Sequence, residues 1–182
     1  MTRLLLIRHA KPAANWDVAD DAGLDPTGQA QAAALPALLA SRGPLPIVTS
    51  PLRRTRETAT PLADAWSVEP VVDPAVGEIA SPGVTMEERS SWLGVVMASQ
   101  WADLDASLQL WRDSLLATLL ALPADTVVVT HFVAINTVVG ACAGDQRVLS
   151  FSPAHTSITE IEVAGGALQL VERGAEADTT VR

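Results

Sequence analysis

The sequence predicts an α/β protein, specifically a three-layer α/β/α sandwich with a mainly parallel central sheet and an antiparallel hairpin at one edge. Short apolar runs alternate along the chain with segments of helical periodicity, a pattern typical of parallel strands buried on both faces. Near the end of the chain, polar and apolar residues alternate on either side of Gly165-Gly166, which predicts the hairpin. The strands are expected at residues 4–7, 47–49, 68–72, 126–130, 156–163 and 167–172.

The helices are predicted from apolar stripes with helical spacing and from their start signals. Asp25-Pro26 and Ser50-Pro51 each combine a residue that caps a helix with a proline suited to its first turn. Pro36 predicts a kink in the first helix because proline lacks the backbone donor. The helices are expected over residues 25–43, 51–65, 105–122 and 131–143.

The domain organisation is simple. At 182 residues, the chain is expected to form one domain, residues 1–182, without internal repeats or an interdomain linker. Residues 81–103 have a weaker pattern, with Trp92 and Trp101 on short predicted helices. This segment is a candidate for a small cap over the functional site.

The composition excludes several classes of partner. The net charge is −9 and lysine or arginine runs are missing, so we expect no nucleic-acid partner. The apolar stretches are too short for a membrane span or a signal peptide, and Cys142 is the single cysteine. We therefore expect a cytoplasmic protein with no membrane partner. The basic residues gather early in the chain, which favours a small anionic substrate in a focused pocket: Arg8, Lys11, Arg53, Arg54 and Arg56.

Two of the predicted buried strands run directly into a histidine. Arg8 and His9 follow the first strand, and His131 follows the strand at 126–130. Because the carboxyl ends of parallel strands meet at one edge of a sheet, we expect both histidines at that edge. Arg54 lies in the first turn of the helix after the second strand, where the amides and the dipole also favour an anion. Two histidines and two arginines around one anion are typical of phosphoryl transfer.

Taken in order, several segments resemble the signatures of the histidine phosphatase superfamily, also called phosphoglycerate mutase-like. Five positions differ from the family pattern: Ala10 and Phe132 each replace a glycine, Lys11 and Pro12 replace acidic and hydroxyl residues, and His155 replaces a frequent asparagine. The matching segments are Arg8-His9-Ala10 with Asn15, Leu24 to Ala30, Ser50 to Ala59, Glu78-Ile79, Thr130-His131 and Thr156 to Thr159.

The resemblance implies a role for each matching residue. His9 is expected to attack phosphorus and become phosphohistidine, while Glu78 donates the proton to the leaving oxygen and later activates water. Substrate binding is expected from Arg8, Asn15, Arg54, His131 and Phe132, where Phe132 narrows the pocket. The rival proton donors are Glu57, Asp73 and Glu87, and His155 is expected to be a structural hydrogen-bonding residue.

The expected function is that of a histidine acid phosphatase-type phosphoric monoester hydrolase, without metal or cofactor, acting on a small phosphorylated metabolite. Between Glu78 and His131 the chain carries the basic residues Arg89 and Arg112 alone, which favours water over a second anionic molecule as phosphoryl acceptor. Three alternatives stay open. They are a phosphoglycerate mutase-type phosphotransferase, a metal-dependent hydrolase using His9, His131 and His155, and a non-catalytic phosphate-binding module.

Overall fold

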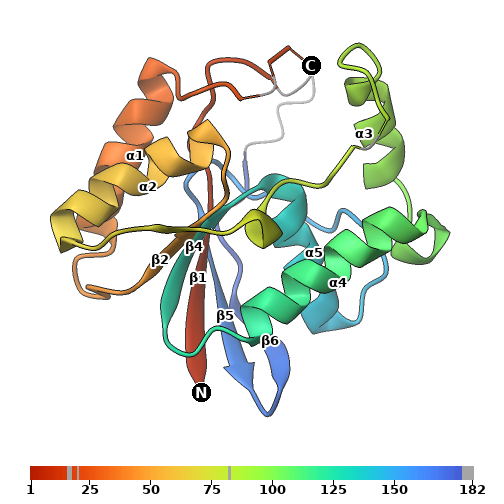
Figure 1. The fold of residues 1–182 in the computed structure, drawn as a ribbon. Coiled ribbons are helices and arrows are strands. Elements are labelled where there is room, and N and C mark those ends of the chain that lie inside the picture. The colour runs from red at the N-terminus through yellow and green to blue at the C-terminus, as the bar shows by residue number, and fades with distance from the viewer. Residues whose placement is uncertain (16–17, 20, 82, 178–182) are drawn as a thin grey trace.

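The computed structural model describes residues 1–15, 18–19, 21–81 and 83–177, and it contains a six-stranded mixed sheet in the order β3-β2-β4-β1-β5-β6 (Figure 1). The strands are β1 (Thr2–Arg8), β2 (Ile47–Thr49), β3 (Val71–Val72), β4 (Thr126–Thr130), β5 (Ile158–Ala164) and β6 (Ala167–Glu172). The helices are α1 (Pro26–Leu38), α2 (Arg53–Trp66), α3 (Arg89–Met97), α4 (Ala106–Leu120) and α5 (Phe132–Ala143), with short 3₁₀ turns η1 (Pro74–Val76) and η2 (Trp101–Asp103).

The centre of the sheet is parallel and one edge is antiparallel, which confirms the predicted fold class. β1 pairs in parallel with β4, and β2 lies parallel to both β4 and β3. On its other side β1 pairs antiparallel with β5, and β5 continues into the hairpin with β6. The apolar runs of β1 and β4 are buried throughout because helices cover both faces of the sheet.

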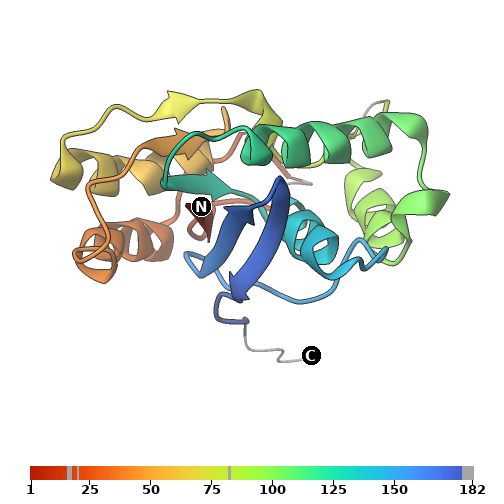
Figure 2. The ribbon, with the colours of Figure 1, turned by 90° about the horizontal axis from the view of Figure 1, so that it is seen from below.

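Alternate residues of β1 divide the core into two halves. Leu4 and Leu6 pack in a cluster with apolar side chains of α4 and α5. Leu5 and Ile7 point to the opposite face, where they pack against α1 and α2. The two helix pairs therefore form the outer layers of a three-layer sandwich (Figure 2).

Three of the differences from the predicted element boundaries concern α1, β3 and α2. α1 contains Pro36 but ends at Leu38 instead of reaching residue 43. The third strand is restricted to Val71–Val72, whose side chains are exposed because β3 is the edge of the sheet. α2 begins at Arg53, and Leu52 occupies the position before it without a side-chain cap. Ser50 is therefore not the N-cap of α2 that the sequence predicted, although its Oγ accepts from the Leu52 amide at 3.2 Å.

The region between β3 and α4 forms a small core of its own. Val96 of α3 and Trp101 of η2 are buried together with Leu108 and Val133, which belong to α4 and α5. The backbone of Trp101 also donates to the carbonyl of Gln146 at 2.8 Å. Figure 1 shows α3 beyond the end of the sheet toward which β1 and β4 point. In the described residues, none of the helices has the length and apolar character needed to cross a membrane.

A close approach between α1 and the loop after β1 requires a glycine at position 28. A Cβ atom at Gly28 would lie 2.1 Å from the carbonyl oxygen of Lys11. The same carbonyl accepts a hydrogen bond of 3.1 Å from the backbone of Asp25, whose carboxylate caps the helix by accepting from the Gly28 amide at 2.7 Å. The start of α1 thus holds the segment that continues from His9.

We predict that Gly28→Ala lowers the free energy of unfolding by about 2 kcal/mol, because the added methyl group forces two backbone segments apart. Gly94→Ala is the matched control, since a Cβ at this position in the interior of α3 meets no atom within 4 Å. The control should stabilise the protein by up to about 1 kcal/mol through helix propensity. Urea unfolding measures both changes, and equal effects of the two substitutions would contradict the close approach at Gly28.

Candidate active site

The pairing of β1 with β4 brings the two strand-end histidines together. Arg8 lies opposite Thr130 in the parallel register, so His9 and His131 follow at the same edge of the sheet. The His9 amide donates to the Thr130 carbonyl at 2.9 Å, which extends the ladder by one residue. The centroids of the two imidazole rings are 5.3 Å apart.

The hydrogen bonds of His9 determine which of its ring nitrogens is available. Nδ1 lies 2.8 Å from the carbonyl oxygen of Ala10, which can only accept, so Nδ1 carries the proton and Nε2 keeps its lone pair. The Ala10 amide donates to Oγ1 of Thr58 at 2.9 Å, and this hydroxyl donates to the Arg54 carbonyl at 2.6 Å. The turn that carries His9 is thereby attached to α2.

Burial keeps His9 neutral. Its side chain is 5% exposed, and this burial is the main reason that its pKa lies well below the usual value. The positive charges of Arg54 and Arg8 lower the pKa further. A neutral imidazole with a free Nε2 has the form that a nucleophile requires.

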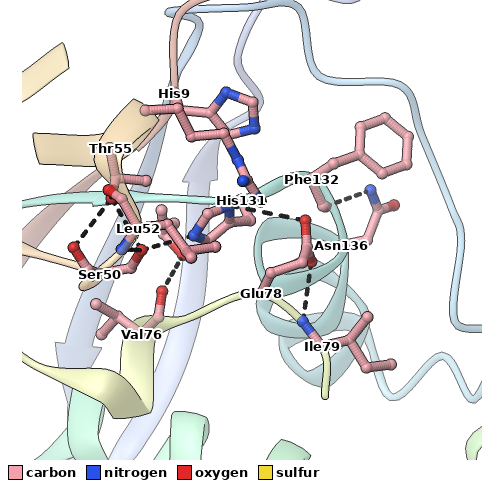
Figure 3. A network of polar contacts seen from close by, with 12 residues as sticks. His9, Ser50, Leu52, Thr55, Val76, Glu78, Ile79, His131, Phe132 and Asn136 are labelled. Atoms are coloured by element: carbon pink, nitrogen blue, oxygen red, sulfur yellow. Dashed lines mark hydrogen bonds and ion pairs between the residues drawn. The ribbon is translucent and has the colours of Figure 1, made fainter. Parts of the chain in front are cut away.

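His131 lies deeper than His9 and is fully buried (Figure 3). Its Nδ1 accepts from Nη2 of Arg54 at 3.3 Å, because arginine can only donate. Nε2 therefore carries the proton and donates to Oγ of Ser50 at 2.7 Å. Ser50 in turn lies 2.8 Å from Oγ1 of Thr55, which donates to the Leu52 carbonyl at 2.7 Å. This chain orients the ring, and burial holds the pKa of His131 well below its ordinary value.

Two arginines supply the positive charge of the site. Arg8 donates through Nη1 to the Pro153 carbonyl at 2.7 Å, and its buried Nε lacks a hydrogen-bond partner within the described part of the chain. Burial lowers the pKa of Arg8 to about 10, which still leaves the group cationic at neutral pH. Arg54 is 4% exposed, and burial also lowers its pKa, opposed by the nearby Glu78.

Glu78 is the carboxyl group at this site. Its Oε1 accepts from the Ile79 amide at 3.0 Å, and its Oε2 lies 3.7 Å from Nδ1 of His131 (Figure 3). Burial raises the pKa of Glu78, although Arg54 and Arg8 favour its charged form. The raised pKa increases the fraction of the carboxylic acid, which is the form that can donate a proton.

The rival carboxylates that the sequence left open lie elsewhere. Glu57 accepts from the amide of Leu24 at 2.7 Å and pairs with Arg53 at 2.6 Å. Asp73 caps η1 through the amide of Ala75, and Glu87 is exposed. Among the acidic residues that the structure describes, Glu78 is the one that lines the cavity at the histidines.

The cavity has a volume of about 380 Å³. Of the residues predicted from the sequence, Arg8, His9, Asn15, Arg54, Glu78 and Phe132 line it. His131 lies beneath the surface of the cavity, and Asn15 is exposed. Lys11, one of the basic residues that gather early in the chain, and the neighbouring Pro12 also line the cavity. Sequence reasoning missed Ala14, Leu93, Met97 and Val133, because no motif marks these four residues.

His155 also lines the cavity, in addition to making the structural hydrogen bond expected for it. Its Nδ1 donates to the His9 carbonyl at 3.0 Å, and the two rings are 5.6 Å apart. Asn136 holds the loop that carries His155, since its Oδ1 accepts from the amides of Ser150 and Phe151 at 2.9 and 3.1 Å. Burial, followed by the charge of Arg8, lowers the pKa of His155.

The described residues contain no group of three or more His, Cys, Asp or Glu side chains placed to hold a metal ion. Two arginines, Arg8 and Arg54, instead line the cavity together with His9. This arrangement of positive charge suits an anion, because guanidinium groups donate in a plane that matches phosphate oxygens.

We predict that the free energy of unfolding falls as the pH decreases from 7.5 to 5.5. Unfolded histidines take up protons near pH 6.5, whereas the lowered pKa values of His9 and His131 keep both rings neutral in the folded state. Between pH 7.5 and 5.5 each histidine lowers the free energy of unfolding by up to about 1.4 kcal/mol. The measurement is best made in Glu78→Gln, since the raised pKa of Glu78 stabilises the folded state in the opposite direction. Equal stability at the two pH values would contradict the buried neutral rings.

Comparison with known proteins identifies the family. Residues 4–176 match the model of the histidine phosphatase superfamily, branch 1. A search of curated proteins gave no match. Among solved structures, a phosphoserine phosphatase from Entamoeba histolytica in complex with 3-phosphoglyceric acid is 22% identical with a TM-score of 0.75, covering 96% of this chain and 98% of its own.

Two further structures have the same fold. A putative α-ribazole-5′-phosphate phosphatase from Escherichia coli is 18% identical with a TM-score of 0.77, covering 97% of each chain. A mycobacterial glucosyl-3-phosphoglycerate phosphatase, solved with VO₃, is 21% identical with a TM-score of 0.68, covering 96% of this chain and 100% of its own. At these identities the likeness concerns the fold, whereas the family match spans nearly the whole sequence. The chain belongs to the histidine phosphatase superfamily, branch 1.

Proposed function

We propose that the protein is a phosphomonoesterase that hydrolyses a small phosphorylated metabolite through a phosphohistidine at His9. The observation that carries this proposal is the tautomer of His9, whose Nδ1 donates to Ala10 and whose Nε2 keeps a lone pair in a cavity that the half-buried Arg8 and the buried Arg54 also line. The phosphatases among the structural neighbours support the same reaction type. The cavity is at the small end of ligand pockets, which suits a compact monoester.

In the first step, Nε2 of His9 forms a bond to phosphorus while the bond from phosphorus to the ester oxygen breaks. The proton of the Glu78 carboxyl group moves to that oxygen, and the alcohol leaves. Arg8 and Arg54 stabilise the charge on the remaining phosphoryl oxygens. His131 contributes through Arg54, because its Nδ1 accepts the hydrogen bond that orients this guanidinium group.

In the second step, a water molecule attacks the phosphohistidine. The new bond joins the water oxygen to phosphorus, the bond to Nε2 breaks, and the Glu78 carboxylate takes up one proton of the water. Inorganic phosphate leaves, and both His9 and Glu78 return to their initial protonation states. The atoms, protons and charges of both steps balance without a metal or a cofactor.

Water is the proposed acceptor, in preference to the second phosphorylated molecule that a mutase requires. A mutase must hold a substrate with a further anionic group beside the phosphohistidine. The basic residues that line the cavity in the described chain are Arg8, Lys11 and Arg54, and Lys11 is paired with Asp25 at 3.0 Å. The two arginines are then engaged by one phosphoryl group, which leaves little positive charge for another.

The intermediate can be trapped with labelled substrate. We predict an acid-labile phosphate on the peptide that contains His9 after rapid quenching without acid, and no label after His9→Ala. His155 is the alternative nucleophile, because its ring also lines the cavity, so His155→Ala must retain the label. Label on the His155 peptide, or on a serine, would show that His9 is not the nucleophile.

Glu78→Gln tests the proton donor. We predict that this substitution lowers kcat/KM for alkyl phosphates by about a hundredfold or more, but far less for aryl phosphates, because a good leaving oxygen needs little protonation. Glu57→Gln is the control, since Glu57 lies outside the cavity. This substitution should change kcat/KM little for either alkyl or aryl phosphates. A uniform loss for both substrate types in Glu78→Gln would assign Glu78 a different role.

A further inference from the structure

The cavity has two chemically different sides. One side consists of the charged and imidazole groups already described. The other side is formed by Leu93 and Met97 of α3 together with Phe132 and Val133 at the start of α5, and Pro12 and Ala14 add apolar surface from the loop after β1. Apart from Lys11, Asn15 and the weakly accepting thioether of Met97, none of the lining side chains outside the charged and imidazole groups can form a hydrogen bond.

α3 presents its two lining residues as a fixed pair. Leu93 and Met97 are four residues apart and therefore share one face of the helix. Val96 is buried in the core beneath α3, whereas Val95 is 67% exposed on the outside. The helix is thus held from below while its Leu93 and Met97 side chains face the cavity.

Phe132 is held beside the charged groups. The guanidinium carbon of Arg8 lies 4.9 Å from the centre of the Phe132 ring, within the range of a cation–π contact. The ring therefore adjoins the position of the phosphoryl group, and the first carbon atoms of the alcohol part must pass it. A glycine at this position, as in the family pattern, would leave that space open.

The charge distribution disfavours a second anionic group on the same substrate. Arg8 and Arg54 act on the phosphoryl group, and the ammonium group of Lys11 is 3.0 Å from the carboxylate of Asp25. Outside the charged and imidazole groups, Asn15 and the paired Lys11 are the polar side chains of the lining, whereas the apolar residues offer no partner to a carboxylate, an ammonium group or a series of sugar hydroxyls. Burying such groups without partners is costly.

We propose that the substrate is a monoester of an apolar alcohol, and that Leu93, Met97 and Phe132 are the residues that determine this specificity. This inference rests on the proposed phosphatase function and specifies its substrate class. Apolar atoms of the alcohol contact the leucine, thioether and aromatic side chains, while the phosphoryl group faces the arginines. Amino-acid and carboxylate phosphates are then poor substrates, because their charged groups enter the apolar side.

The test is a series of unbranched alkyl phosphates from methyl to butyl, compared with phosphoserine and 3-phosphoglycerate. From ethyl onward the leaving oxygens of the alkyl series are nearly equal in basicity, so differences in kcat/KM report contacts of the chain. We expect kcat/KM to rise by up to about fourfold for each added methylene, as for full burial of a methylene group. Butyl phosphate should exceed both charged metabolites.

In the variants Leu93→Ser and Met97→Ser, kcat/KM should increase less with the length of the alkyl chain than in the natural protein. Val95→Ser is the matched control on the same helix, because Val95 faces solvent and should leave the rise unchanged. A flat series in the natural protein, or faster turnover of phosphoserine, would overturn the apolar substrate class while leaving the phosphatase reaction intact. Absence of turnover for every ester by the folded protein would overturn the proposed function and this inference together.

Discussion

The parallel pairing of β1 with β4 is the constraint on which the site depends. Both strands are buried on both faces, so their register is held by packing against two separate layers of helices. A shift of one residue would move Leu5 and Ile7 to the face of Leu4 and Leu6, and it would separate His9 from His131. The juxtaposition of His9 and His131 is therefore a consequence of core packing, and the loops beyond the strands shape the cavity around it.

Burial of ionisable groups is the second principle of the structure. Desolvation lowers the pKa values of His9 and His131 and raises that of Glu78, so each group is shifted toward its neutral form. Arg8 and Arg54 remain cationic in the same region, and without an anion their charges are poorly compensated. In the proposed function, a phosphoryl group supplies the missing negative charge, so the same burial that makes the two arginines costly without an anion favours phosphate binding.

The sequence predicted the parts of the site that follow from strand ends. An apolar run that ends at Arg8-His9 or at Thr130-His131 indicates a buried strand and shows at which end of the strand the histidine lies. The helix α2 was predicted separately, from its start signal and helical spacing. The role of Ser50 was not predictable, because Ser50-Pro51 has the form of a helix cap, whereas its hydroxyl accepts from His131. The depth of His131 and the inward face of α3 depend on contacts between segments far apart in the chain. Leu93 and Met97 therefore carried no local signal.

The central claim is that the His9 ring is neutral in the free protein, with its proton on Nδ1 and with Nε2 available as the nucleophile. The direct measurement is ¹⁵N NMR of the histidine ring nitrogens in the free protein at pH 6 to 8, with His9→Asn used to assign the signals. We expect a protonated Nδ1 and an unprotonated Nε2 for His9 throughout this range. An imidazolium signal at pH 6, or a proton on Nε2 of the neutral ring, would contradict the claim.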